Sequence, residues 1–148
     1  MSEPIRQRYD RWRLGELLLR YPGLRIVPDG GDDLVLAGSL AFCATGPTQE
    51  TIEDSYAVEL RVPNGLPKQL PTARETDGRI PNTFHKLAGG LLCLGAPTAI
   101  RLELTLAPTL LRFVEGFVVP YLYGYSFFVI HGKMPFDELA HGDAGIRQ

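Results

Sequence analysis

The residue whose type and setting best suit covalent chemistry is Cys93. It lies in the uncharged segment from Ala88 to Gly95, directly after two glycines and two leucines. Glycines let the backbone approach a substrate closely and supply unusual dihedrals. Functional side chains concentrate on loops, and a thiolate can carry an acyl group as a thioester. A lone cysteine among leucines is also typical of a small buried hydrophobe. These local features leave both interpretations of Cys93 open.

The chain has three histidines that could assist a nucleophile: His85, His131 and His141. His85 precedes Cys93 by eight residues, so the two form a candidate nucleophile and base, or two residues brought together by a turn. No Cys-x-x-Cys or His-x-x-x-His spacing occurs, and no Gly-x-Gly-x-x-Gly, Walker or Gly-x-Ser-x-Gly pattern occurs. We therefore expect no metal and no cofactor. Cys43 ends a predicted strand and is expected to lie in the core.

Size and charge bound the classes of protein to consider. The 148 residues suit one domain, residues 1–148, and the net charge of −2 argues against a general nucleic-acid binder. With two cysteines, a disulfide framework is not indicated, although one bond between them is compatible with the sequence. The amino-terminal residues lack the apolar run of a signal peptide. We expect a cytoplasmic protein that does not enter the membrane.

The first predicted element is a helix from Pro4 to Arg20, because Pro4 suits a first turn and apolar residues recur at helical spacing. Tyr21-Pro22-Gly23 ends it. Five arginines lie in this segment: Arg6, Arg8, Arg11, Arg13 and Arg20. They form either a solvated polar face or a docking surface for an acidic partner.

Two strands follow in the sequence pattern. Leu34 to Phe42 is apolar on both alternations, which predicts a central strand covered on both faces. The segment from Tyr56 to Val62 alternates with period two, which predicts a strand with one wet face. Three prolines then follow at a spacing of four, Pro63, Pro67 and Pro71, and they favour a stiff extended connection.

The remaining segments favour helices at the carboxy-terminal end. Ala99 to Leu104 suits a short strand, after which Thr105 can cap a helix from Leu106 that Pro120 should kink or end. The apolar stretch from Phe113 to Ile130 contains a glutamate, a proline and two glycines, so we interpret it as a core helix. A last helix is predicted from Pro135 to His141. A helix, a run of strands and then helices is an α+β layout with an antiparallel meander.

Taken in order, these features resemble the ubiquitin-conjugating-enzyme (E2) family, in particular its divergent bacterial members. The strand from Tyr56 to Val62 and the spaced prolines resemble the second strand and proline signature of that family. His85 and the later Gly89-Gly90-Leu91-Leu92-Cys93-Leu94 resemble the histidine and the Gly-x-x-Cys-Leu segment of its active site. The resemblance covers roughly Ile5 to Leu104 in organisation, and its specific part is Tyr56 to Gly95.

The resemblance implies a ubiquitin-conjugating-enzyme-like (UBC-like) fold and a catalytic role for Cys93. In that family the cysteine accepts the carboxy-terminal glycine of a ubiquitin-like protein from an E1 enzyme and passes it to an amine. The implied partners are an E1-like activating enzyme, a ubiquitin-like protein and an isopeptidase of the same pathway, and bacterial sets of this kind are associated with phage defence. His85 would shape the loop, and Arg6, Arg8 and Arg13 would dock a partner.

The sequence departs from the family pattern just after His85. Lys86-Leu87 stands where the family has Pro-Asn, so the asparagine that supports the oxyanion is absent at its usual offset, with Asn82 three residues upstream of His85. Losing one such donor costs on the order of 10²-fold in rate. This departure favours a second hypothesis, an E2-fold adaptor without conjugating activity. A third is a free-standing cysteine–histidine hydrolase, which needs a base beside Cys93.

Overall fold

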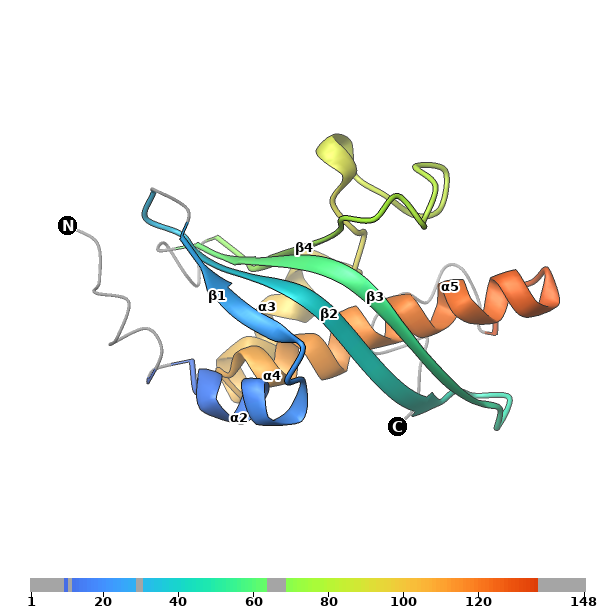
Figure 1. Ribbon diagram of the computed structural model, residues 1–148, viewed down its shortest axis with the longest axis horizontal. Helices are drawn as coiled ribbons and strands as arrows, with labels where there is room; N and C mark the ends of the chain where they lie inside the picture. The colour runs from blue at the N-terminus through green and yellow to red at the C-terminus, as the bar shows by residue number, and fades with distance from the viewer. Residues whose placement is uncertain (1–9, 11, 29–30, 64–68, 136–148) are drawn as a thin grey trace.

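The computed structural model describes residues 10, 12–28, 31–63 and 69–135 (Figure 1). The described elements are α2 (Leu14–Arg20), β1 (Leu24–Val27), β2 (Leu34–Thr45), β3 (Thr51–Val62), β4 (Thr72–Glu75), the single turn η1 (Ala88–Gly90), α3 (Pro97–Leu106), α4 (Leu110–Phe113), the π-helical turn η2 (Val114–Val118) and α5 (Val119–His131). The predicted α+β layout, with a helix, an antiparallel meander and carboxy-terminal helices, is confirmed at this level.

The four strands form an antiparallel sheet in the order β1-β2-β3-β4. β2 and β3 pair along their whole length, from Leu34 opposite Val62 to Thr45 opposite Thr51. The outer strands are much shorter, since β1 covers only Val35 to Gly38 of β2 and β4 covers only Val58 to Arg61 of β3. The hairpin of β2 and β3 therefore projects beyond its neighbours, with α5 running beneath it (Figure 1).

The predicted alternation of β3 is confirmed. Its even-numbered residues from Tyr56 to Val62 are buried, and the intervening Ala57, Glu59 and Arg61 are half-buried. The buried side chains of β2 and β3 pack against the carboxy-terminal helices in one continuous core. Fully burying one such aliphatic or aromatic side chain contributes roughly 1.5–3 kcal/mol.

The expectation that Leu34 to Phe42 is covered on both faces is wrong for its second half. Leu34, Val35 and Leu36 are all buried, but from Ser39 onward the strand alternates, with Leu40 and Phe42 buried. The helices cover one face of the sheet only, so the small side chains of Ala41 and Cys43 on the other face are exposed. The expectation that Cys43 lies in the core is therefore also wrong.

The first predicted helix is interrupted near its middle, since Asp10 is helical but Trp12 and Arg13 are not. α2 begins at Leu14, because Arg13 has a left-handed backbone with φ 52° and interrupts a helix that would run from Pro4. The carbonyl of the buried Trp12 accepts a hydrogen bond from Leu110 N–H at 3.3 Å, so it serves a tertiary contact rather than a helical one. Residues 4–9 and 11 lie outside the described residues.

Two predictions about the segment after Cys93 are wrong. Ala99 to Leu104 belongs to α3 rather than to a strand, because Pro97 starts a helix that turns only Ile100 and Leu104 into the core. Thr105 lies inside α3, and the capping residue of the next helix is Thr109, whose Oγ1 accepts from Arg112 N–H at 3.1 Å. Of the helix predicted from Pro135 to His141, residues 136–141 lie outside the described residues.

Pro120 neither ends nor breaks the last helix. It stands in the first turn of α5, directly after the wider turn η2, and there Val119 N–H bonds to Val114 five residues back. A π turn of this kind shifts the backbone hydrogen bonds by one residue, which accommodates a residue that has no N–H to donate. The continuous helical segment Leu110–His131 is long and apolar enough to cross a membrane, but 67% of its most apolar 18-residue stretch is buried, as in the core helix of a soluble protein.

Candidate active site

Cys93 is presented at the surface by two buried neighbours. Leu92 and Leu94 are 3% and 7% exposed, whereas Cys93 between them is half-buried. Leu92 N–H donates to Ala73 O at 2.9 Å, which ties this segment to β4. Cys93 N–H donates to His85 O, also at 2.9 Å. The thiol is thus held at a fixed place beside the sheet and remains accessible.

The two glycines before Cys93 make the turn that returns the chain toward it. Leu87 N–H donates to Leu91 O at 2.8 Å, and Gly90 N–H donates to Leu87 O at 3.2 Å. Gly89 and Gly90 have φ of 77° and 80°. L-residues rarely adopt this region, and glycine does so without cost. The unusual dihedrals predicted for these glycines are confirmed.

His85 and Cys93 are brought together through their backbones. The His85 ring packs edge-on against Phe84, with ring centroids 4.8 Å apart. His85 itself has a positive φ of 48°, which is uncommon for a residue other than glycine. The Phe84 carbonyl accepts a hydrogen bond of 2.5 Å from the Tyr121 hydroxyl on α5. This arrangement suits a residue that organises the loop leading to Cys93.

The loop before His85 is fixed by a buried carboxylate. Glu75, only 6% exposed, accepts hydrogen bonds from Asp77 N–H at 2.7 Å and from Ile80 N–H at 2.8 Å. The carbonyl of the same Ile80 accepts a hydrogen bond from Lys86 Nζ at 2.7 Å. The Lys86 side chain therefore helps to fix the same turn.

Tyr121 is the residue of α5 whose hydroxyl holds the loop before Cys93. Burial raises the pKa of Tyr121 well above its ordinary value. The phenol therefore stays protonated at neutral pH and keeps donating to Phe84 O. On the same helix, Tyr125 donates to Arg79 O at 3.1 Å. α5 thus holds the cysteine loop at two points.

The other sequence-predicted residues lie apart from this loop or outside the described residues. Arg13 is exposed and pairs with Glu16 at 3.4 Å, as expected for a solvated face, and Arg6 and Arg8 lie outside the described residues. His131 pairs with Glu50 at 2.7 Å, at the tip of the β2–β3 hairpin. The two cysteines are free thiols. Within the described residues, no group of three metal-ligating side chains occurs.

Sequence reasoning missed three residues that position the loop: Glu75, Tyr121 and Tyr125. Glu75 follows an unremarkable Thr-Ala-Arg and carries no pattern that would reveal its burial. The three tyrosines of α5, at every second position, were a possible signal, because a buried tyrosine usually needs a hydrogen-bond partner for its hydroxyl.

Comparison with known proteins adds no relative to this picture. No protein-family model, curated protein or solved structure matches the chain.

Proposed function

We propose that this chain is a bacterial E2-like conjugating enzyme with a UBC-like fold. The Cys93 thiolate attacks the thioester carbonyl that joins a ubiquitin-like protein to an E1-like enzyme, and the E1 cysteine leaves as a thiolate. An acceptor amine then attacks the new Cys93 thioester, forms an amide and releases the Cys93 thiolate. The proposal places the protein in the cytoplasm, in an antiphage conjugation pathway that also includes an isopeptidase.

The observation that carries this proposal is the presentation of Cys93. Its thiol is accessible, its two neighbours are buried, and its N–H is held by the carbonyl of His85. A buried structural cysteine would not need this arrangement. The layout of an amino-terminal helix, an antiparallel meander and carboxy-terminal helices also supports the proposal.

The test uses ubiquitin and a panel of bacterial ubiquitin-like proteins, each carrying a carboxy-terminal alkyl thioester in place of the E1. Mass spectrometry should find one adduct on the wild type and on Cys43→Ser, and reducing agent should release it. Cys93→Ser should carry a reductant-resistant oxyester or no adduct, because a hydroxyl forms the more stable ester. Loading of Cys93→Ala at the wild-type level would show that Cys93 is not the acceptor.

A second candidate is an E2-fold adaptor without conjugating activity. Lys86-Leu87 replaces the family's Pro-Asn, and the backbone N–H of Cys93 is already used by His85, so neither supplies an oxyanion donor. Asn82 is exposed in the turn Pro81–Phe84. An adaptor would bind a ubiquitin-like protein or a partner enzyme in the same experiment without forming an adduct on any cysteine.

A further inference from the structure

The side of β2 that faces away from β3 is open along its second half, in the part of the chain that the structure describes. β1 pairs with Val35 to Gly38, and one further hydrogen bond joins Ser39 N–H to Gly23 O at 3.1 Å. On the amino-terminal side of Gly23 the chain leaves the sheet and forms α2, while β2 continues to Thr45. Figure 1 shows this part of β2 at the margin of the sheet.

The register identifies the backbone groups that line this edge. Backbone groups alternate between the two sides of a strand, and Ser39 faces β1, so those of Ala41, Cys43 and Thr45 face the same, open side. The pairing with β3 runs from Leu34 to Thr45 without a break, which keeps the alternation intact. No described backbone group outside the strands bonds to these three residues.

The opposite margin of the hairpin is treated differently. β3 also extends beyond its short neighbour, but there Arg79 donates to Ser55 O at 2.8 Å and forms a two-point ion pair with Asp54. An arginine thus covers the edge of β3. Charged side chains that cover an edge are a common protection against strand addition. The edge of β2 has no such cover among the described contacts.

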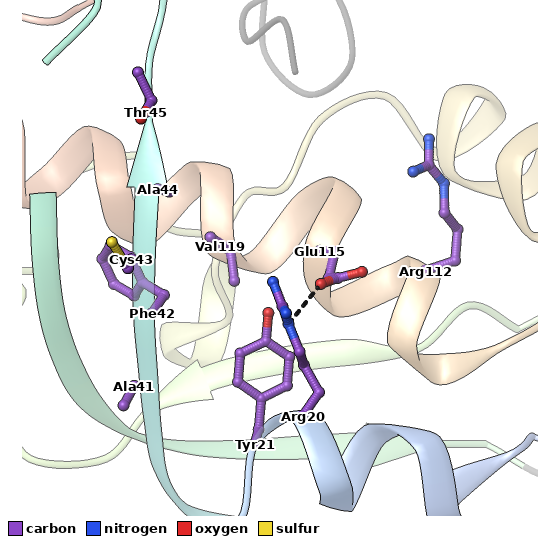
Figure 2. A pocket seen from close by; sticks show the side chains of 10 residues that line it. All are labelled: Arg20, Tyr21, Ala41, Phe42, Cys43, Ala44, Thr45, Arg112, Glu115 and Val119. Atoms are coloured by element: carbon purple, nitrogen blue, oxygen red, sulfur yellow. Dashed lines mark ion pairs between the residues drawn. The ribbon is translucent and has the colours of Figure 1, made fainter. Parts of the chain in front are cut away.

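A hollow of about 540 Å³ lies beside the open edge of β2. It is bounded by Ala41 to Thr45 on one side and by the helical segment with Glu115 and Val119 on the other. Arg20 and Tyr21 rise from the end of α2 into the space between them (Figure 2). The hollow gives an added strand room for its side chains next to the sheet.

The direction of an added strand follows from β1. A strand that pairs antiparallel with Ala41 and Cys43 runs in the same direction as β1. Its carboxyl end therefore reaches Gly23, which blocks any further extension. Arg20 stands at that end, where its Nε pairs with Glu115 at 3.2 Å. Glu115 takes the Nε–H of Arg20, and the terminal nitrogens of this guanidinium carry further N–H donors that suit an anionic group. Arg112 also lines the hollow, but its Nε pairs with Glu103 at 2.9 Å.

We propose that this edge binds the extended carboxy-terminal tail of a partner protein, which adds an antiparallel strand to β2 and places its terminal carboxylate beside Arg20. Backbone hydrogen bonds to Ala41 and Cys43 supply the affinity, and the ion pair with Arg20 selects a free terminus. The site is separate from Cys93 and does not depend on any chemistry of that residue.

The test selects binders from random heptapeptides displayed with free carboxy termini, and then follows amide hydrogen exchange of the full chain by NMR. Saturating peptide should slow exchange of the Ala41, Cys43 and Thr45 amides. The Leu40, Phe42 and Ala44 amides serve as the internal control, because they already face β3. Amidation of the peptide terminus should weaken binding about tenfold, and Arg20→Gln should remove that difference while Arg112→Gln keeps it.

Backbone pairing is tested from the peptide side, which needs no change in the fold. N-methylation at the amides that face β2 should abolish binding, and N-methylation at the alternate amides should not. Equal binding of the two methylated peptides, or a selection that enriches no peptide, would overturn the proposal. Slow exchange at Ala41, Cys43 and Thr45 before any peptide is added would also overturn it, since a second copy or another segment of the chain would then occupy the edge.

Discussion

The positive φ of His85 makes its substitution informative. The left-handed region is tolerated best by glycine and asparagine, whereas β-branched residues are strained there. We predict that His85→Asn keeps most of the stability and most of the loading of Cys93, and that His85→Val loses both together. Thermal unfolding and the thioester loading assay measure the two effects.

The same position separates a structural role from a general base. If His85 takes the proton, His85→Asn and His85→Gln fold normally but both lose acyl transfer, and the wild-type rate has a pH dependence that they lack. A rate–pH curve of His85→Asn that runs parallel to the wild-type curve supports the role of a loop organiser. A folded His85→Asn that loads but never transfers would contradict it.

The loop between β4 and Cys93 depends on Glu75. Removing this carboxylate leaves the N–H groups of Asp77 and Ile80 without their acceptor, and the second is buried. We predict that Glu75→Ala lowers the free energy of unfolding by about 2–4 kcal/mol, and that Glu75→Gln, which keeps one acceptor oxygen, loses less. Denaturant titration measures this loss, with Glu53→Ala on the exposed face of β3 as the control. An equal, small effect for Glu75→Ala and Glu53→Ala would contradict the assigned role.

The amino-terminal arginines provide a test of partner docking. If Arg6, Arg8 and Arg13 contact an acidic E1 surface, changing all three to Glu should slow E1-dependent loading without altering the unfolding temperature. The loss should shrink at high salt, because exposed charges are screened beyond about 10 Å at 0.1 M ionic strength. Loading of the triple variant from a small-molecule thioester donor is the control. It should equal the wild-type loading, because no E1 takes part. Unchanged E1-dependent kinetics would leave these residues as a solvated face, as the exposed pair of Arg13 and Glu16 already suggests for Arg13.

Several elements were predictable from the sequence because their pattern has a single physical explanation. The alternation of β3 and the turn at Gly89-Gly90 are of this kind. The segment from Ala99 to Leu104 was not, since its apolar residues alternate as in a strand and also recur at helical spacing. The tertiary contact that decides it, the burial of Ile100 and Leu104 only, is absent from local sequence. The exposure of Cys43 was likewise hidden, because a small apolar residue is compatible with either face of a sheet.

The candidate site was predictable only in part. Cys93 stood out through its glycines, and His85 through its spacing, but the groups that hold their loop come from β4 and α5. Glu75 and Tyr121 lie far from Cys93 in the sequence, and only the fold brings them to the same loop. Long-range polar contacts of this kind have no periodic signature.

At the scale of the whole molecule, a polar network joins α5 to the sheet. Asp54 on β3 accepts hydrogen bonds from Arg79 and from Ser126 Oγ, and Ser126 in turn bonds to the Tyr56 hydroxyl at 2.6 Å. The Arg79 guanidinium also lies over the Tyr56 ring, 4.1 Å from its centroid. Burial raises the pKa of Tyr56 to about 12, so its hydroxyl remains a donor at neutral pH.

The network predicts a pH dependence of stability. Burial acts to raise the pKa of Asp54, but hydrogen bonds from Arg79, Ser126 and the Ser55 N–H outweigh it and lower the pKa to about 2. An unfolded aspartate titrates near about 4, so the unfolded chain takes up the proton first on acidification. The contribution of Asp54 is therefore complete above about pH 4 and is lost as the pH falls toward 2.

Thermal unfolding between pH 2 and pH 6 checks this prediction. Asp54→Asn should be less stable than the wild type at pH 6, and the difference should shrink as the pH falls below 4. Glu53→Gln, its neighbour on β3, is the matched control. A constant difference between Asp54→Asn and the wild type across this range would mean that Asp54 acts through packing alone.

The turn at the tip of the β2–β3 hairpin limits which substitutions the chain can accept during evolution. A Cβ atom built on Gly46 would lie 2.4 Å from the ring of Tyr123, whose hydroxyl donates to Glu50 O at 2.6 Å. Neither residue can change alone without a clash or a lost hydrogen bond. In an alignment of descendants of this chain, a residue larger than glycine at position 46 should therefore appear only together with a smaller side chain at position 123.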